Sequence, residues 1–99
     1  MYIIKELNTG LYYTGKTFFP LSPNLKDAKL YKLKQEPQLL LATKYMHLMN
    51  PVLWNIVKHY LELHHNKDIC EIDLSFEYLK SISENYRLGI RQVDLIEKE

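Results

Sequence analysis

Four side chains that could hold a metal ion lie close together in the second half of the sequence. His59, His64 and His65 precede Cys70, and imidazole plus thiolate is the ligand set that zinc favours. The spacing argues against a metal site, because His59 and His64 would lie about 140° apart around a helix. The chain also has a single cysteine, so no Cys-x-x-Cys pair exists. We predict a polar helix end here, with no metal and no cofactor.

The sequence also contains no pattern typical of covalent or acid–base catalysis. Cys70 lies in an apolar alternation, which is typical of a small buried side chain, and no serine sits in a Gly-x-Ser-x-Gly turn. Glu71 and Asp73 alternate along the chain, with Glu77 following, which indicates a solvated face rather than a general acid and base. Three glycines are too few for a phosphate-binding loop. The sequence therefore predicts a protein without catalytic residues.

A stretch rich in lysine and tyrosine is the most suggestive pattern. Single-stranded nucleic-acid binders combine lysines on phosphates with aromatic rings on bases, whereas tyrosine also suits protein recognition. The stretch lacks arginine, and the pI of about 7.8 is low for a dedicated nucleic-acid binder. Protein binding is therefore preferred, with nucleic acid as the alternative. The predicted partner-binding residues are Tyr12, Tyr13, Lys16, Lys26, Lys29, Tyr31, Lys32 and Lys34.

Charge is divided unevenly along the chain. Residues 1–50 carry seven lysines against three acids, a net charge of +4, and residues 51–99 carry six bases against nine acids, a net charge of −3. If the halves form different faces, the basic one would attract an acidic partner. Eight tyrosines among 99 residues exceed what one core needs, so we expect some at the surface.

The first half predicts a hairpin followed by a third strand. Residues 2–7 and 11–14 are rich in β-formers, and Asn8, Thr9 and Gly10 supply the turn, with Gly10 left-handed. After a bend at Gly15, residues 18–19 resume the second strand before Pro20. Residues 20–24 form a loop, and 25–28 form one helical turn capped by Asn24. The polar–apolar alternation of residues 29–34 predicts a strand.

Helices dominate the prediction for the second half. One runs from Pro37 to about residue 49, and another begins at Asn50-Pro51 and ends near residues 64–66. Residues 69–74 form a strand or continue toward the next helix, which Ser75 caps and Gly89 terminates. Residues 90–96 form a final strand. The core stripe of the second helix is Val52, Ile56, Tyr60 and Leu63, and that of the third is Phe76, Leu79, Ile82 or Ser83, and Tyr86.

These elements predict a single α+β domain spanning residues 1–99. Its small antiparallel or mixed sheet comprises the N-terminal hairpin and about three further strands, with about three helices packed on it. No apolar run approaches the ~18–20 residues of a membrane span. The N-terminal residues lack signal-peptide features and the lone cysteine cannot form an internal disulfide. We expect a cytoplasmic protein that folds alone or as a symmetric homodimer.

Three segments in the first third of the chain resemble a known group of proteins. They are Tyr2-Ile3-Ile4-Lys5, Thr9-Gly10-Leu11-Tyr12-Tyr13-Thr14-Gly15 and Asn24-Leu25-Lys26-Asp27-Ala28-Lys29-Leu30-Tyr31. The pattern resembles the opening of short proteins encoded by phages and mobile elements of low-GC Gram-positive bacteria. In those proteins a hairpin leads into an Asp-x-x-x-Ala-Lys-x-Tyr-like segment, of which this chain keeps a shorter form.

The resemblance implies a context rather than a mechanism. Small phage proteins without catalytic residues often bind a host or phage protein, and inhibitors of bacterial defence, anti-CRISPR proteins among them, are frequently of this size. Inhibitors that occupy a nucleic-acid channel are usually strongly acidic, and this chain is not. We therefore expect a non-enzymatic protein-binding accessory factor, phage-encoded and directed against a host defence complex such as CRISPR, by a route other than DNA mimicry.

Overall fold

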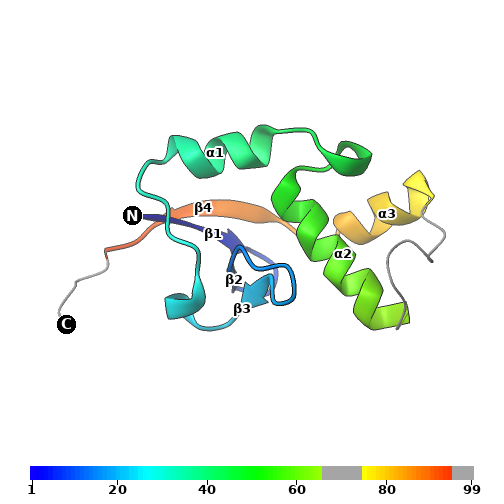
Figure 1. The fold of residues 1–99 in the computed structure, drawn as a ribbon, viewed down its shortest axis with the longest axis horizontal. Helices are drawn as coiled ribbons and strands as arrows, with labels where there is room; N and C mark the ends of the chain where they lie inside the picture. The colour runs from blue at the N-terminus through cyan, green and yellow to red at the C-terminus, as the bar shows by residue number, and fades with distance from the viewer. Residues whose placement is uncertain (66–74, 95–99) are drawn as a thin grey trace.

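A four-stranded antiparallel sheet forms one side of the structure, a computed structural model that describes residues 1–65 and 75–94 (Figure 1). The strands are β1 (Tyr2–Glu6), β2 (Leu11–Tyr13), β3 (Leu21–Ser22) and β4 (Leu88–Gln92), in the order β3-β2-β1-β4. β1 pairs with both β2 and β4, so the first and last strands of the chain lie side by side, with β4 at the edge of the sheet. Together with the helices, this confirms the predicted α+β class.

The predicted hairpin is confirmed, and the connection after it differs from the prediction. Gly10, at φ 78°, donates its N–H to the Glu6 carbonyl at 2.8 Å and closes the β1–β2 turn. Gly15, at φ 79°, turns the chain out of β2, so residues 18–19 lie in an exposed loop rather than continuing the strand. The Thr14 N–H bonds the Pro20 carbonyl at 2.9 Å and closes that loop before β3. β3 itself occupies residues that the sequence assigned to a loop.

The predicted strand over residues 29–34 is wrong. Tyr31 forms an isolated bridge to Tyr2 with N···O distances of 2.8 and 2.9 Å, and the Lys29 N–H donates to the Tyr13 carbonyl at 2.9 Å, but no continuous strand forms. Tyr2 lies at the start of β1, beyond the residues that pair with β2. Leu30 and Leu33 are exposed. The helical turn predicted nearby is confirmed as a 3-10 helix, η1 (Leu25–Asp27), although the Asn24 side chain does not cap it.

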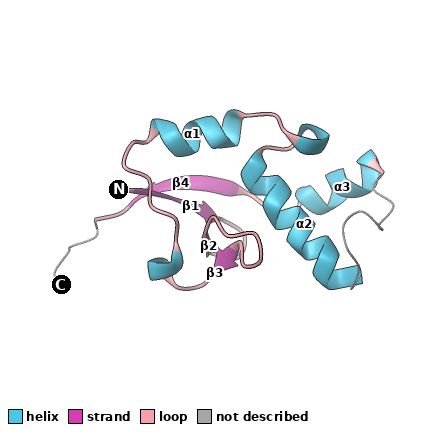
Figure 2. Ribbon diagram, in the orientation of Figure 1, coloured by secondary structure: helices cyan, strands magenta, loops and turns pink. Residues whose placement is uncertain are grey.

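The helices cover one side of the sheet and extend beyond it (Figure 2). They are α1 (Gln35–Ala42), the 3-10 helix η2 (Met46–Leu48), α2 (Pro51–His65) and α3 (Phe76–Ser83). The helix predicted from Pro37 to about residue 49 is therefore split in two. The caps of the later helices are confirmed: Asn50 Oδ1 accepts the Leu53 N–H at 2.7 Å, and Ser75 Oγ accepts the Tyr78 N–H at 3.2 Å.

The end of the chain corrects two further predictions. Gly89 does not terminate a helix, since α3 ends at Ser83. Gly89 lies in β4 and pairs with Lys5 of β1. The final strand begins two residues earlier than the predicted 90–96 and runs to Gln92. The prediction for residues 69–74 lies outside the described residues. No helix within residues 1–65 and 75–94 has the length and hydropathy of a membrane span.

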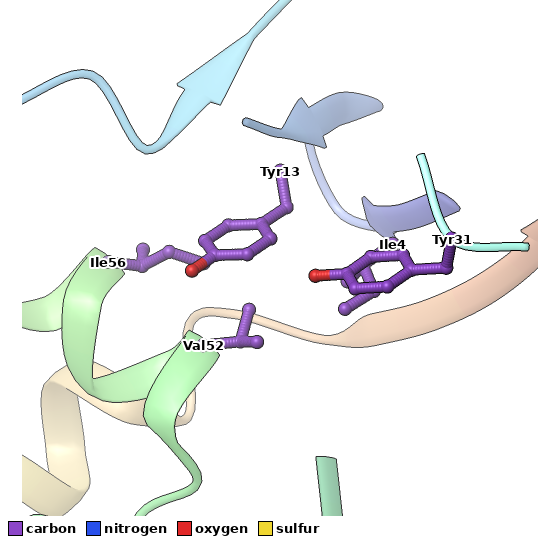
Figure 3. Packing of buried hydrophobic residues seen from close by; sticks show 5 residues of the cluster. All are labelled: Ile4, Tyr13, Tyr31, Val52 and Ile56. Atoms are coloured by element: carbon purple, nitrogen blue, oxygen red, sulfur yellow. The ribbon is translucent and has the colours of Figure 1, made fainter. Parts of the chain in front are cut away.

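Two apolar clusters share α2 as a common wall. The first joins the sheet to α2 through Ile4, Tyr13, Tyr31, Val52 and Ile56 (Figure 3). The second joins α2 to α3 and comprises Met49, Val57, Leu61, Leu79 and Ile82.

The predicted core stripes are therefore only partly right. Val52 and Ile56 are buried as predicted, whereas Tyr60 and Leu63 are exposed. Figure 1 shows the later turns of α2 running away from the sheet, and Leu63, near the end of that helix, is 69% exposed. Phe76, the first residue of α3, is also exposed.

A buried carboxylate ties the hairpin to the strand that ends the domain. Glu6 is fully buried and accepts the N–H groups of Asn8, Thr9 and Arg87 at 3.1, 2.8 and 2.8 Å, as well as the Thr9 hydroxyl at 2.6 Å. Burial by itself would raise its pKa, but these hydrogen bonds outweigh that effect and hold the pKa of Glu6 below its ordinary value of 4.5. The ionised form is therefore the one that the fold stabilises.

Replacing Glu6 by Gln should destabilise the fold by about 1–3 kcal/mol, because an amide NH2 would face the donors that the carboxylate accepts. The depressed pKa also sets a pH dependence. Glu6 contributes stability above its unfolded pKa near 4.5, and that contribution is lost as the pH falls through the lower, folded pKa. Thermal melts between neutral and acidic pH should show a steeper loss below pH 4.5 in wild type than in Glu6→Gln. Parallel pH profiles for the two proteins would contradict this role.

Candidate functional site

The five lysines predicted to bind a partner are all exposed. Lys26, Lys29, Lys32 and Lys34 follow the chain from η1 to the start of α1, and Lys16 lies in the loop after β2. A shallow hollow of about 540 Å³ lies between Lys29, Lys32 and the first turns of α1, and the exposed Leu39 stands at its rim. We call the five lysines, together with this hollow, the lysine surface. It presents ammonium groups over an apolar floor.

The predicted tyrosines do not join the lysines at the surface. Neighbouring residues of a strand face opposite sides of the sheet, so Tyr12 and Tyr13 cannot both point outward. Tyr13 faces α2 in the core, and Tyr31 does the same from the segment that pairs with Tyr2 (Figure 3). Tyr13 and Tyr31 are 9% and 7% exposed. Their burial removes them from the predicted interface.

The position of Tyr12 and the pKa of Tyr31 also argue against the predicted tyrosine interface. Tyr12 is half-buried, and the Lys5 ammonium lies 5.5 Å from its ring centroid, so its ring already has a cationic partner. Burial, followed by the nearby Tyr13 and Glu36, raises the pKa of Tyr31 to about 12. Tyr31 therefore stays neutral at physiological pH and acts as a core residue. The expectation of surface tyrosines is met elsewhere, by Tyr45 and Tyr60.

A second surface, which the sequence did not suggest, is a groove at the helical end of the molecule. A hollow of about 370 Å³ is lined by residues from the end of α1, the turn through η2, the start of α2 and the helix α3. Its walls are mainly apolar, and it is lined by two lysines and by no acidic residue among those that the structure describes. We call it the helical groove. Its principal apolar residues are Leu41, Leu48, Leu53, Phe76 and Leu79.

A tight turn between α1 and α2 builds one rim of the helical groove. The helix α1 stops at Ala42, where Thr43 becomes extended and its hydroxyl donates to the Leu39 carbonyl at 2.7 Å. The chain then reverses: the Tyr45 N–H donates to the Met49 carbonyl at 2.7 Å, and the Met49 N–H donates to the Met46 carbonyl at 3.0 Å. This closure is possible because Leu48 adopts a left-handed conformation.

Leu48 combines two unfavourable features. Its φ of 64° makes it the one non-glycine residue with positive φ among the described residues, and this conformation costs a side-chain-bearing residue about 1 kcal/mol. Its side chain is also 69% exposed, whereas the next residue, Met49, is buried in the α2–α3 cluster. The turn therefore directs Met49 inward and Leu48 outward, beside the 53% exposed Phe76. Neither feature of Leu48 helps the isolated chain to fold.

A third, smaller hollow lies between α2 and the loop that precedes β3. It measures about 240 Å³, and its walls include Phe19, Tyr60 and Leu63. Asn55 Nδ2 donates to the Lys16 carbonyl at 3.3 Å and holds the loop against α2. The Tyr60 and His64 rings stack with centroids 5.3 Å apart. This hollow has aromatic walls but no lysine and no carboxylate among its described lining residues.

The structure describes part of the histidine-rich segment only. His59 lines the third hollow and His64 stacks on Tyr60, while Cys70 lies outside the described residues. Within residues 1–65 and 75–94, no three His, Cys, Asp or Glu side chains come together as a metal site would require. The carboxylate with a lowered pKa, Glu6, is enclosed by its own hydrogen bonds. Its position is that of a structural group.

The sequence did not point to the helical groove. Three consecutive leucines, residues 39–41, cannot all face the core of one helix, but only the structure shows that Leu41 lines the groove while Leu39 is 70% exposed outside it. Leu48 carried no signal of its conformation, because left-handed positions are normally marked by glycine or asparagine. Phe76 fitted a core stripe by spacing alone. The groove thus depends on residues whose types predicted burial.

The fold and these surfaces define a small α+β domain with an exposed apolar groove. Comparison of the chain with protein-family models, curated proteins and solved structures found no match. Its function must therefore be inferred from the surfaces themselves.

Replacing Leu48 by Gly and by Ala should give an unusual order of stability. Both changes remove the exposed side chain, but only glycine adopts positive φ without strain. We expect Leu48→Gly to be more stable than Leu48→Ala by up to about 1 kcal/mol, or roughly 4–8 °C in Tm. Thermal unfolding followed by circular dichroism measures the difference.

The same pair of substitutions at Leu39 is the matched control. Leu39 is equally exposed but lies within α1, where glycine is less favourable than alanine by about 1 kcal/mol. The order of the two variants should therefore be reversed there. An alanine variant more stable than the glycine variant at both positions would show that Leu48 is not strained.

Proposed function

We propose that this chain is a non-enzymatic protein-binding factor that uses the helical groove as its main binding surface. The observation that carries the proposal is the exposed Leu48, held at φ 64° beside Phe76 on an apolar groove. A partner that covers these side chains would gain about 25 cal/mol for each Å² of apolar surface removed from water. Binding would thus offset the backbone strain and the solvent exposure of Leu48, which folding of the isolated chain does not offset.

The exposed apolar side chains around the groove also support protein binding. Tyr45 and Met46 are 56% and 48% exposed on the same turn as Leu48. Aromatic residues and methionine are enriched at the centres of protein interfaces, and methionine adapts to irregular partner surfaces. A contiguous apolar patch with a polar rim is a common mark of an interaction site. The helical groove, with Lys44 and Lys80 at its edge, has that composition.

The resemblance of residues 1–31 to short phage proteins supplies the proposed context. On that basis the partner is a protein of a bacterial host, and the chain is a phage-encoded inhibitor of a defence complex such as CRISPR. The near-neutral charge of +1 favours binding through apolar contacts over mimicry of nucleic acid. This part of the proposal rests on the resemblance alone.

The lysine surface supports a second candidate, single-stranded nucleic-acid binding. Lys26, Lys29 and Lys32 are exposed within one short stretch, and Phe18 and Phe19 are 89% and 49% exposed in the loop after β2. Lysines would neutralise phosphates and aromatic rings would stack on bases. The burial of Tyr13 and Tyr31 removes two of the rings that favoured this function. It therefore ranks below protein binding.

Replacing Leu48 by Gly should weaken partner binding while the chain still folds. A tagged wild-type chain and its Leu48→Gly variant would be compared by quantitative affinity capture from a Gram-positive host lysate. We expect a specific protein to be captured by wild type and depleted at least tenfold with Leu48→Gly, since truncating an interface hot spot typically costs about 2 kcal/mol or more. Leu39→Ala, at an equally exposed leucine outside the groove, should capture as wild type does. Equal capture by all three proteins would exclude the groove as the binding surface.

Combined substitution of Lys26, Lys29 and Lys32 by Ala distinguishes the two candidate functions. If the lysine surface binds nucleic acid, wild type should bind a fluorescent oligo(dT), more weakly as salt rises, and the triple variant should not. If the groove binds protein, the triple variant should capture the same partner as wild type. Absent or salt-insensitive oligonucleotide binding by wild type would eliminate the nucleic-acid function.

A further inference from the structure

The helical groove has a charge character that follows from its position between helices. Lys44 lies just past the end of α1 and Lys80 on α3, and both line the groove. No acidic side chain lines it among the described residues. Lys44 and Lys80 are also exposed. The groove therefore combines an apolar floor with two cationic groups at its edge.

From this arrangement we infer that the groove receives an acidic amphipathic helix of the partner protein, with leucine-like side chains on the floor and carboxylates beside Lys44 and Lys80. The inference rests on the proposed protein-binding function and names the chemistry of the partner.

The walls of the groove favour a helix over an extended peptide. An extended peptide binds by adding a strand to a free sheet edge, where unpaired backbone groups accept it. Here the walls are α1, the η2 turn, α2 and α3, whose backbone groups are largely bonded within their own helices and turns. A helix instead docks its apolar ridge between the side chains of other helices. Leu41, Leu53 and Leu79 provide such a floor.

The rim residues indicate a macromolecule rather than a small amphiphile. Leu48 and Phe76 are 69% and 53% exposed, so together they offer apolar surface for an occupant to cover. A small molecule sunk in about 370 Å³ would leave much of that surface in water. A helix about 10–12 Å across would cover the rim and the floor together.

Complementary charge would give this docking its specificity. A carboxylate near each lysine would neutralise it at the edge of the interface, where such pairs chiefly set the on-rate and the choice of partner. A basic helix with the same leucines would meet two like charges. Affinity would come from the apolar floor and Leu48, and discrimination from Lys44 and Lys80.

Two synthetic helical peptides test the inference on the full chain. Each has about 16 residues, or four turns, with leucines spaced i, i+3, i+4 and i+7; the flanking positions are glutamate in one peptide and lysine in the other. Binding is measured by fluorescence anisotropy at about 0.15 M salt. We expect the glutamate peptide to bind at least ~10-fold more tightly, and Leu48→Gly to lower its affinity at least ~10-fold.

Charge reversal in the groove is the decisive comparison. Lys44→Glu combined with Lys80→Glu should reverse the preference, so that the lysine peptide binds more tightly. Lys26→Glu combined with Lys29→Glu changes the net charge by the same amount on the lysine surface and should preserve the wild-type preference. Failure of both peptides to bind, equal binding of the two, or the same effect from both double variants would each overturn the inference.

Affinity capture distinguishes failure of the acidic-helix inference from failure of the proposed protein-binding function. If a host protein is lost with Leu48→Gly but retained by the Lys44→Glu and Lys80→Glu double variant, the groove binds protein and the acidic helix is wrong. If Leu48→Gly captures everything that wild type captures, the proposed function itself fails.

Discussion

The packing of α2 on two sides is the constraint on which the rest of the structure depends. Val52 and Ile56 lie against the sheet, while Val57 and Leu61 lie against α3. At about 100° per residue, Val52 and Val57 are separated by about 140° around the helix, so one helix can serve two clusters. Each cluster alone would be small for a domain of this length. The helix α2 makes them one folded unit, and its start also forms part of the helical groove.

Hydrogen bonding completes the connection between the ends of the domain. Glu6 joins the hairpin turn to Arg87, just before β4, and β1 lies between β2 and β4. A buried carboxylate is tolerated here because its oxygens accept four hydrogen bonds. This region is polar, closed and structural. The helical end, by contrast, leaves apolar side chains open to solvent.

That contrast explains why binding is assigned to the helical groove. At the sheet end Ile3 and Ile4 are almost completely buried, and the exposed Phe18 and Phe19 lie in a loop without positive φ at either residue. At the other end a short turn holds Leu48 outward in a strained conformation. Strain and exposure together are costs to the isolated chain, and binding can offset both. The lysine surface lacks this signature, since exposed lysines over a shallow hollow are an ordinary solvated surface.

Several elements were predictable from local sequence because local chemistry decides them. The hairpin follows from Gly10 in a left-handed position, α2 from the Asn50 cap and Pro51, and the start of α3 from Ser75. The α+β class followed from these elements, and the lysines were expected at the surface as charged residues generally are.

Which of several similar residues faces the core depended on tertiary structure. Alternation over residues 29–34 predicted a strand, yet β1 offers Tyr31 a single pairing position. Spacing placed Leu63 and Phe76 in core stripes, but both are exposed and line hollows open to solvent.

By itself, therefore, the sequence determined the fold class, the β1–β2 turn and the caps of α2 and α3, because these depend on residues close together in the chain. Only the tertiary structure decided that Tyr13 and Tyr31 are core residues and that Leu48 and Phe76 border an open groove. The reason is physical: burial is determined by which distant segments arrive to cover a side chain, and residue type alone does not specify them.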